Sequence, residues 1–381
     1  MKSAGDDKKV SPAPDNSHRP RLQDLGLTIG QFARGKLNAV TDVAGVKVGH
    51  ATLWYGEGPL EPGKGPVRTG VTAIFPHSGN TLDAPVEAGC HVFNAAGTTA
   101  GLSLLEEYGQ IETPILLTST LAVGMAYHAL VRYVLENFCR GPNHKSWFNP
   151  LVGETDDSFL NDSHGLHLQP EHVVEAIRSA AGGPVAEGAV GAGTGTRTCG
   201  FKSGIGTSSR LVQIDDRTFT IGALVQSNFL GSLTVDGVPV GLEPGMAPEL
   251  GNARPEGSLM AIMATDLSLS ARQLKRLAAR GVLGMARTGA YGGHSSGDYF
   301  IAFSTTYREN QLKSRGPFCR ASILTSDEFL TPVFIAASEA VEEAILNSIF
   351  KAVTVTGRDG HTAREIDVEN TKEILKCHGK L

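Results

Sequence analysis

The amino-acid sequence predicts an α/β layered domain, because short apolar runs alternate along it with helical patterns and Gly-containing turns. A chain of 381 residues with 41% hydrophobic content is long enough to bury a sizeable core. No repeat of about 20–50 residues is apparent, and the 46 glycines cluster in turns rather than in a periodic series. We therefore expect a single sheet-centred domain over residues 21–381.

Five apolar segments predict strands, and four longer segments predict helices. The strands are expected over 70–75, 114–118, 218–225, 259–264 and 299–304. The helices are expected over 121–138, 170–181 and 270–286, and from residue 331 onward. Ser270 with Gln273 forms a capping signature at the third helix. In the last helix, apolar residues fall at steps of three and four, the pattern of a helix packed on a sheet: Phe334, Ala337, Val341, Ile345 and Ile349.

Charge and hydropathy exclude several classes of partner. The net charge is −5 and no dense Lys/Arg tract occurs, so we expect neither a nucleic-acid partner nor an anionic membrane surface. No uninterrupted apolar run is long enough to span a bilayer, and the N-terminus lacks the apolar core of a signal peptide, which predicts a cytoplasmic protein. Residues 1–20 are polar and Pro-rich, and we expect them to form a disordered tail.

No pattern indicates a metal or a cofactor. The five cysteines are widely spaced without a C-x-x-C pair, and the histidines show no H-E-x-x-H arrangement, so we expect free thiols and no metal site. Residues 58–64 have P-loop spacing, but Gly65 stands where a Ser or Thr should hold magnesium. Residues 191–196 lack the final glycine of a dinucleotide fingerprint and predict only a tight Gly-rich loop.

The residues at the junction between Gly257 and Ser258 are those that a self-cleavage site would need. A small flexible residue leads a Ser directly into an apolar strand-like run. Attack of Ser258 Oγ on the carbonyl of Gly257 would form an ester, and hydrolysis would leave Ser258 with a free α-amine. An α-amine has an unperturbed pKa of about 7.7–8.0, so it can act as a base near neutral pH. The alternative is an ordinary Gly-Ser turn before a strand.

Further polar residues lie at the ends of other expected strands. Ser296 and Asp298 are two residues apart at the start of a strand, so period-two alternation places both side chains on one face. The pair could accept a proton or orient an α-amine; alternatively, it caps a turn. Gly293–Gly297 matches the G-x-S-x-G elbow, but an elbow leads from a strand into a helix, whereas here a strand follows.

Two other polar sites could bind a developing oxyanion and the amine of a substrate. Asn228 follows an apolar strand and could donate to an oxyanion, although Asn is equally a turn former. Glu154, Asp156 and Asp157 come directly after an apolar run and would suit capture of a cationic amine, or form a solvated loop.

Together these residues resemble the L-aminopeptidase/D-esterase and β-peptidyl aminopeptidase family, from about Leu25 to the C-terminal helix. The matching segments are 38–46 (NAVTDVAGV), 49–50 (GH), 70–74 (GVTAI), 124–126 (GMA), 153–155 (GET), 201–210 (FKSGIGTSSR), 225–229 (VQSNF) and 264–266 (ATD). Many ordered matches are far more specific than any single motif.

The resemblance implies an αββα four-layer sandwich similar to N-terminal nucleophile hydrolases, but with different connectivity. It implies self-cleavage between Gly257 and Ser258 into fragments 1–257 and 258–381, no cofactor, and a homotetramer of processed heterodimers. The implied roles place Ser258 as nucleophile, Ser296 and Asp298 as its polar partners, Asn228 as oxyanion donor and Glu154 as anchor for the substrate amine.

The chain departs from the family pattern at two places. Asp156 stands where a Tyr is typical, which adds a carboxylate beside Glu154 and removes a phenol from the pocket. Leu267 and Ser268 replace the more usual Ala-Pro. The resemblance therefore leaves the choice among L-, D- and β-aminoacyl groups open.

The expected activity is that of a serine aminopeptidase that releases N-terminal residues from small peptides, amides or esters through an acyl-enzyme on Ser258. One alternative is an acyltransferase similar to the self-cleaving ornithine acetyltransferases, in which an amine intercepts the same ester. The other is a non-catalytic binding protein that has kept the fold without the chemistry.

Overall fold

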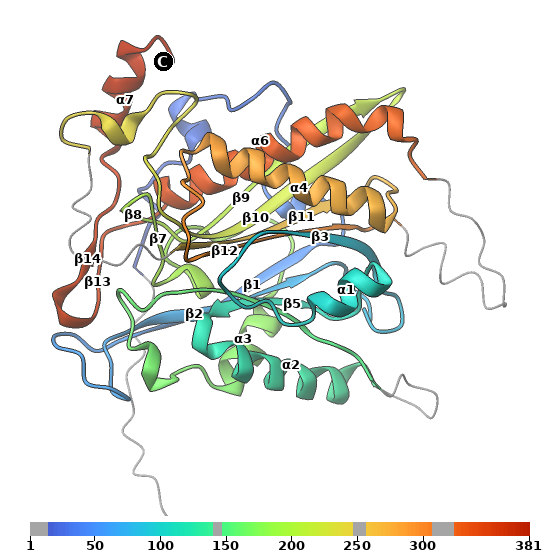
Figure 1. Cartoon of the computed structure of the whole chain (residues 1–381), viewed down its shortest axis with the longest axis horizontal. Coiled ribbons are helices and arrows are strands. Elements are labelled where there is room, and N and C mark those ends of the chain that lie inside the picture. Colours follow the sequence, from blue (N-terminus) through green and yellow to red (C-terminus); the bar gives the residue numbers. More distant parts are fainter. Residues whose placement is uncertain (1–13, 140–146, 247–256, 307–323) are drawn as a thin grey trace, which may run out of the picture.

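Two β-sheets stacked face to face form the centre of the molecule, and helices cover the outer face of each (Figure 1). The computed structural model describes residues 14–139, 147–246, 257–306 and 324–381. The order of layers is therefore helix, sheet, sheet, helix, as the resemblance implied.

The smaller sheet has four strands and is covered by two helices. Its order is β1 (Lys47–Tyr55), β2 (Val67–Phe75), β5 (Ile115–Ser119) and β6 (Leu151–Thr155), with only β5 and β6 parallel. The helices α2 (Val123–Asn137) and α3 (Pro170–Ser179) pack against this sheet and each other.

The larger sheet has six strands and is also covered by two helices. Its order is β4 (Gln110–Ile111), β3 (Val86–Ala95), β12 (Ser296–Ser304), β11 (Gly257–Thr265), β10 (Arg217–Asn228) and β9 (Ile205–Ile214). Only β11 and β12 run parallel. The helices α4 (Ala271–Arg287) and α6 (Leu330–Phe350) lie on its outer face.

The smaller elements include α1 (Leu102–Tyr108), α7 (Val368–Cys377), several 3-10 turns, and two short hairpins made of β7 (Arg197–Thr198) with β8 (Phe201–Lys202) and β13 (Val355–Thr356) with β14 (Thr362–Ala363).

Alternation along β11 shows how the strands divide the core. Met260 and Ile262 point between the two sheets, where they join Ile115, Leu117 and other residues of the smaller sheet. The intervening residues of β11 point to the other side and pack under α4 and α6. A third apolar cluster lies between the smaller sheet and its helices. The three apolar layers account for the four-layer architecture.

The structure confirms all five expected strands and all four expected helices, with ends that shift by a few residues. Ser270 caps α4 as expected, accepting a hydrogen bond from the backbone of Gln273. The expected packing of α6 on the sheet is confirmed, because α6 contacts β9 and β10. The helix is also buried on every side from Ala336 to Phe350, because α4 and the segment 21–43 cover its remaining faces.

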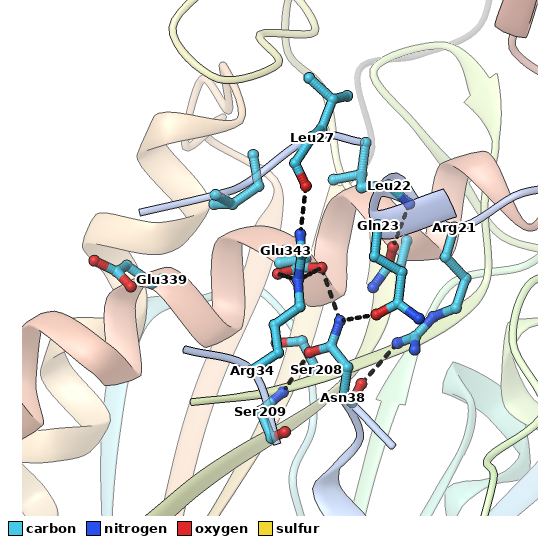
Figure 2. A network of polar contacts seen from close by, with 12 residues as sticks. Arg21, Leu22, Gln23, Leu27, Arg34, Asn38, Ser208, Ser209, Glu339 and Glu343 are labelled. Carbon is cyan, nitrogen blue, oxygen red and sulfur yellow. Dashed lines mark hydrogen bonds and ion pairs between the residues drawn. The ribbon is translucent and has the colours of Figure 1, made fainter. Parts of the chain in front are cut away.

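Two carboxylates of the buried helix α6 form ion pairs with a buried Arg. Arg210 on β9 lies 2.6 Å from Glu343 and 3.3 Å from Glu339 through its guanidinium nitrogens. Glu343 also accepts hydrogen bonds from Arg34 and Asn38, at 2.9 and 2.8 Å, so the N-terminal segment closes over the helix (Figure 2). We call Arg34, Asn38, Arg210, Glu339 and Glu343 the buried ionic network.

Residues 14–20, which were expected to belong to a disordered tail, are ordered. Arg19 is 8% exposed, and its guanidinium donates to the carbonyls of Phe350 and Ile366 at 3.0 and 2.9 Å. The Asn16 side chain donates to the carbonyl of Glu187. Residues 14–20 are therefore packed on the domain, because their few polar groups find buried carbonyl partners that composition does not reveal. Residues 1–13 lie outside the described ranges.

Among the helices of the described ranges, none combines the length and the apolar composition that crossing a bilayer requires. The four cysteines within those ranges are free thiols, and Cys319 lies outside them. Residues 191–196, expected as a tight loop, form a buried 3-10 turn that leads into the β7–β8 hairpin.

Candidate active site

A cavity of about 320 Å³ opens where the carboxyl ends of β5 and β6 meet the amino end of β11. It is lined by Ala96, Thr120, Leu121, Glu154, Asp156, Ser158, Ser163, His164, Gly257, Ser258 and Ser295. Two larger hollows of about 560 and 710 Å³ lie elsewhere, but neither is lined by a Ser, Cys or His side chain. Of these three, only the 320 Å³ cavity is lined by a candidate nucleophile, Ser258.

Ser258 is the second residue of β11 and is 4% exposed. It lies directly opposite Asn228 in the antiparallel pairing with β10, and the Asn228 Nδ2 atom is 3.5 Å from Ser258 Oγ. The Asn228 Oδ1 atom accepts a hydrogen bond of 3.1 Å from the backbone N–H of Arg197 in β7. Because the carbonyl side of the amide is occupied, its N–H₂ side faces Ser258, which is the orientation that an oxyanion donor needs.

Ser296 and Asp298 form the polar pair that the alternation predicted. Ser296 Oγ donates to Asp298 Oδ1 at 2.8 Å, and Asn94 Nδ2 on β3 donates to Asp298 Oδ2 at 2.9 Å. Burial raises the pKa of Asp298, while the hydrogen bonds from Ser296 and Asn94 and one from the backbone of Leu259 oppose that rise. Asp298 is thus a buried carboxylate stabilised by donors from three strands.

The pleat of the sheet places this pair beside the main chain of Ser258 rather than beside its hydroxyl. Gly257 is paired with Ser296, and Ser258 with Gly297. Paired residues point to the same face, so Ser296 and Asp298 leave the sheet on the side of Gly257 and Leu259. A Cβ atom added to Gly257 would lie 3.5 Å from Ser296 Oγ. Within the described residues no hydrogen bond joins Ser258 Oγ to either member of the pair.

Glu154 lies at the end of β6 and is 2% exposed. Its carboxylate accepts hydrogen bonds from the Thr98 backbone N–H, at 2.7 Å, and from the Thr120 hydroxyl. Burial raises the pKa of Glu154, those two hydrogen bonds lower it, and the charge of Asp156 raises it further. A buried carboxylate that no described cation pairs is a strong attractor for an ammonium group.

Asp156 lines the same cavity, two residues beyond Glu154. It is half-buried, and its two carboxylate oxygens accept from the Ser158 backbone N–H and hydroxyl at 3.1 and 2.7 Å. The sequence-predicted residues therefore occupy one region: Ser258, Glu154 and Asp156 line the cavity, and Asn228, Ser296 and Asp298 surround Ser258.

Sequence reasoning missed the residues that hold these groups. Asn94 on β3 contacts Asp298 across 204 positions of sequence, and Thr98 from a loop and Thr120 from a 3-10 turn reach Glu154. Single polar residues carry no periodic signal, so only the fold brings them to the site. Within the described ranges, no group of three or more His, Cys, Asp or Glu side chains is arranged to hold a metal ion.

Comparisons with known proteins identify the family. The family model "Peptidase family S58" matches residues 38–363. The β-peptidyl aminopeptidase BapA of Sphingosinicella microcystinivorans is 43% identical over 377 residues, covering 95% of this chain and 93% of that protein.

Solved structures agree in fold over nearly the whole chain. The PH0078 protein from Pyrococcus horikoshii OT3 has a TM-score of 0.88 at 48% identity, covering 95% of this chain and 100% of that one. A Burkholderia sp. β-aminopeptidase has a TM-score of 0.84 at 38% identity, covering 94% and 99%. The L-aminopeptidase D-Ala-esterase/amidase of Ochrobactrum anthropi, described as a prototype of the serine aminopeptidases and a variant of the Ntn hydrolase fold, has a TM-score of 0.86 at 40% identity, covering 95% and 100%. This chain therefore belongs to peptidase family S58 and is a serine aminopeptidase built on that variant of the Ntn hydrolase fold.

Proposed function

We propose that the protein cleaves its own Gly257–Ser258 bond and then uses Ser258 as the N-terminal nucleophile of an aminopeptidase. The observation that carries the proposal is the position of Ser258. Its hydroxyl lies beside Asn228 Nδ2 in a cavity that also contains Glu154, and its main chain lies beside Ser296 and Asp298.

Self-cleavage begins with attack of Ser258 Oγ on the Gly257 carbonyl carbon. The hydroxyl proton leaves to a base, and the carbonyl oxygen becomes an oxyanion. The side-chain donor assigned to the oxyanion is Asn228 Nδ2, which lies 3.5 Å from the attacking Ser258 Oγ. The C–N bond then breaks, and the nitrogen of Ser258 takes a proton to become an amine. Water hydrolyses the resulting ester, which releases Gly257 as a carboxylate and frees the hydroxyl.

In the processed enzyme the new α-amine lies where the pair Ser296–Asp298 can hold it. An α-amine with a pKa of about 7.7–8.0 is substantially neutral near physiological pH and can accept the proton of Ser258 Oγ. Glu154 anchors the ammonium group of the substrate, which places the first carbonyl of the substrate at Ser258. The acyl group passes to Ser258, the leaving group takes the proton, and water releases the amino acid.

The substrates we propose are small peptides, amino-acid amides and esters with a free amine. The relatives include β-aminopeptidases and an L-aminopeptidase D-Ala-esterase/amidase, so β-, L- and D-aminoacyl groups are all worth testing. A homotetramer of processed heterodimers, a cytoplasmic location and activity without a cofactor also stay proposals. An acyltransferase would share the acyl-enzyme and differ only in the acceptor.

Intact mass of purified protein tests self-cleavage. We expect the wild type to give two fragments, 1–257 and 258–381, and Ser258→Ala to stay one full-length chain. Ser295→Ala is the matched control, since Ser295 lines the same cavity and has no role in the mechanism. A wild-type chain that stays intact while hydrolysing amino-acid amides would rule out self-cleavage as the activating step.

Product analysis then separates hydrolase from transferase. The processed enzyme is given an amino-acid amide with and without an excess of acceptor amine. We expect free amino acid to dominate in both cases. Predominant transfer product at modest acceptor concentration would favour the transferase, and the absence of any turnover by cleaved protein would favour the non-catalytic alternative.

A further inference from the structure

The catalytic cavity contains one carboxylate more than the proposed amine anchor requires. Glu154 and Asp156 both line it, and within the described residues neither forms an ion pair. No Lys or Arg is among the lining residues, and His164 is the only lining side chain there that can become cationic. A substrate with a single ammonium group would neutralise one carboxylate and leave the other facing it.

The two carboxylates differ in how much of their hydrogen-bonding capacity is already used. Glu154 is almost fully buried and accepts hydrogen bonds from Thr98 in a loop and from Thr120 in a 3-10 turn, which fix its position. Asp156 is half-buried, and both of its hydrogen bonds come from Ser158. An ionised carboxylate accepts about four hydrogen bonds, so Asp156 keeps free acceptor capacity. Ser158 orients it without supplying any charge.

Two carboxylates in one cavity favour a second cation on the substrate. The charge of Asp156 contributes to the raised pKa of Glu154, so Asp156 repels the ionised form of Glu154. A second cation on the substrate would relieve this repulsion, and an acidic side chain would increase it.

We infer that Asp156 is a specificity-determining residue that binds the side-chain cation of a basic N-terminal residue on the substrate, while Glu154 binds its backbone amine. This inference rests on the proposed function and names a substrate class for it: lysyl or ornithyl peptides, amides and esters. Residues two apart have Cα atoms separated by at most about 7 Å, a span that the side chains of Lys and ornithine can cover. The favoured substrates are dications.

Paired amide substrates test the inference. Lysine amide is compared with norleucine amide, which has a similar aliphatic chain and no side-chain charge, and with Nε-acetyl-lysine amide, which keeps the length without the charge. We expect wild-type kcat/KM for lysine amide to exceed that for both neutral amides by about tenfold or more, the effect of one charge-assisted hydrogen bond.

The Asp156→Asn variant identifies the residue responsible. We expect it to reduce the ratio of kcat/KM for lysine amide to kcat/KM for norleucine amide about tenfold. Self-cleavage at Gly257–Ser258 serves as the check that the variant folds. Glu154→Gln is the contrasting variant, because it should lower kcat/KM for lysine and norleucine amides alike.

The outcomes are distinguishable. A wild-type enzyme that hydrolyses norleucine amide without preferring lysine amide overturns the inference and leaves the proposed function standing. So does an unchanged preference in Asp156→Asn. Failure of cleaved wild-type protein to hydrolyse any amino-acid amide, ester or peptide overturns both.

Discussion

Ser258 meets different neighbours through its side chain and through its main chain. The hydroxyl lies on the face between the two sheets, beside Asn228 Nδ2. The side chains of Ser296 and Asp298 lie on the opposite face, next to the main chain of the flanking residues Gly257 and Leu259. Self-cleavage would restore the hydroxyl and create one new group, the α-amine, so under the proposed mechanism these two groups have separate partners. Asn228 would serve the oxygen chemistry, and the Ser296–Asp298 pair would serve the amine.

The raised pKa of Glu154 predicts an acid limb in the pH profile. Burial holds the pKa of Glu154 above its ordinary value of 4.5, so the carboxyl keeps its proton to higher pH than an exposed Glu does. Only the ionised form binds an ammonium group. We expect kcat/KM for amino-acid amides to fall as the pH drops through this raised pKa, and kcat/KM against pH is the measurement.

Glu154→Gln supplies the control for that profile. It should reduce kcat/KM by about ten- to hundredfold near neutral pH, mainly through KM, because an uncharged amide is a weaker partner for an ammonium group. It should also remove the acid limb. The same acid limb in wild type and variant would assign it to another group, with Asp298 the next to test because burial raises its pKa too.

At the scale of elements, the spacing of apolar residues predicted the type and position of strands and helices, because that spacing is a property of each element alone. Strands such as β2 and β10 and helices such as α3 are single runs whose apolar spacing lies within the element itself. The surroundings of α6 are not encoded in that way. Its buried face toward α4 and the N-terminal segment carries Glu339, Glu342 and Glu343, which look like solvent-facing residues until distant Arg partners are known.

In the candidate active site, too, the sequence predicted some residues and not others. Ser258, Ser296, Asp298, Asn228 and Glu154 stood out because each lies at a strand end with the right chemistry. The residues that hydrogen-bond to these side chains did not stand out, because Asn94, Thr98 and Thr120 come from separate elements that only tertiary structure brings together. The extent of the N-terminal tail was misjudged for a related reason, since Arg19 and Asn16 bond to backbone carbonyls that leave no mark on composition.

The buried ionic network predicts a large stability difference between two adjacent carboxylates of α6. Glu343→Ala would leave Arg210 fully buried without its shorter ion pair, and breaking one side of a buried pair costs about 3–5 kcal/mol. Glu342→Ala is the control, since its partner Arg287 is 47% exposed on its side chain and stays solvated. Urea denaturation of both variants in a Ser258→Ala background measures the difference within one covalent chain.

We expect the free energy of unfolding to fall by several kcal/mol more in the Glu343→Ala variant than in the Glu342→Ala variant. Equal losses would mean that the network adds nothing beyond the packing of the two side chains.

At the scale of the whole molecule, the larger sheet alternates between the two fragments that self-cleavage would produce. Its order is β4, β3, β12, β11, β10 and β9. The two central strands, β12 and β11, belong to residues 258–381 apart from Gly257, and the strands on both sides belong to residues 1–257. The buried ionic network also joins the fragments, because Arg34, Asn38 and Arg210 precede the junction and both carboxylates follow it.

This arrangement predicts that the cleaved fragments stay together. Separating them would break the β10–β11 and β12–β3 pairings and expose two apolar layers. We expect the fragments to co-elute in size-exclusion chromatography at high salt, with the surface ion pairs screened, and to separate only in denaturant. Elution of fragment 258–381 by itself under native conditions would contradict the sheet order.

The central position of β11 also changes the molecularity of folding. Before cleavage the nucleophile strand enters the sheet as part of one chain, so the effective concentration of its neighbours is set by the connecting segment and not by the amount of protein. After cleavage the same strand must find its place by collision between two molecules. The precursor should therefore refold at a rate independent of dilution, whereas the mature enzyme should regain activity with second-order kinetics and in lower yield as it is diluted.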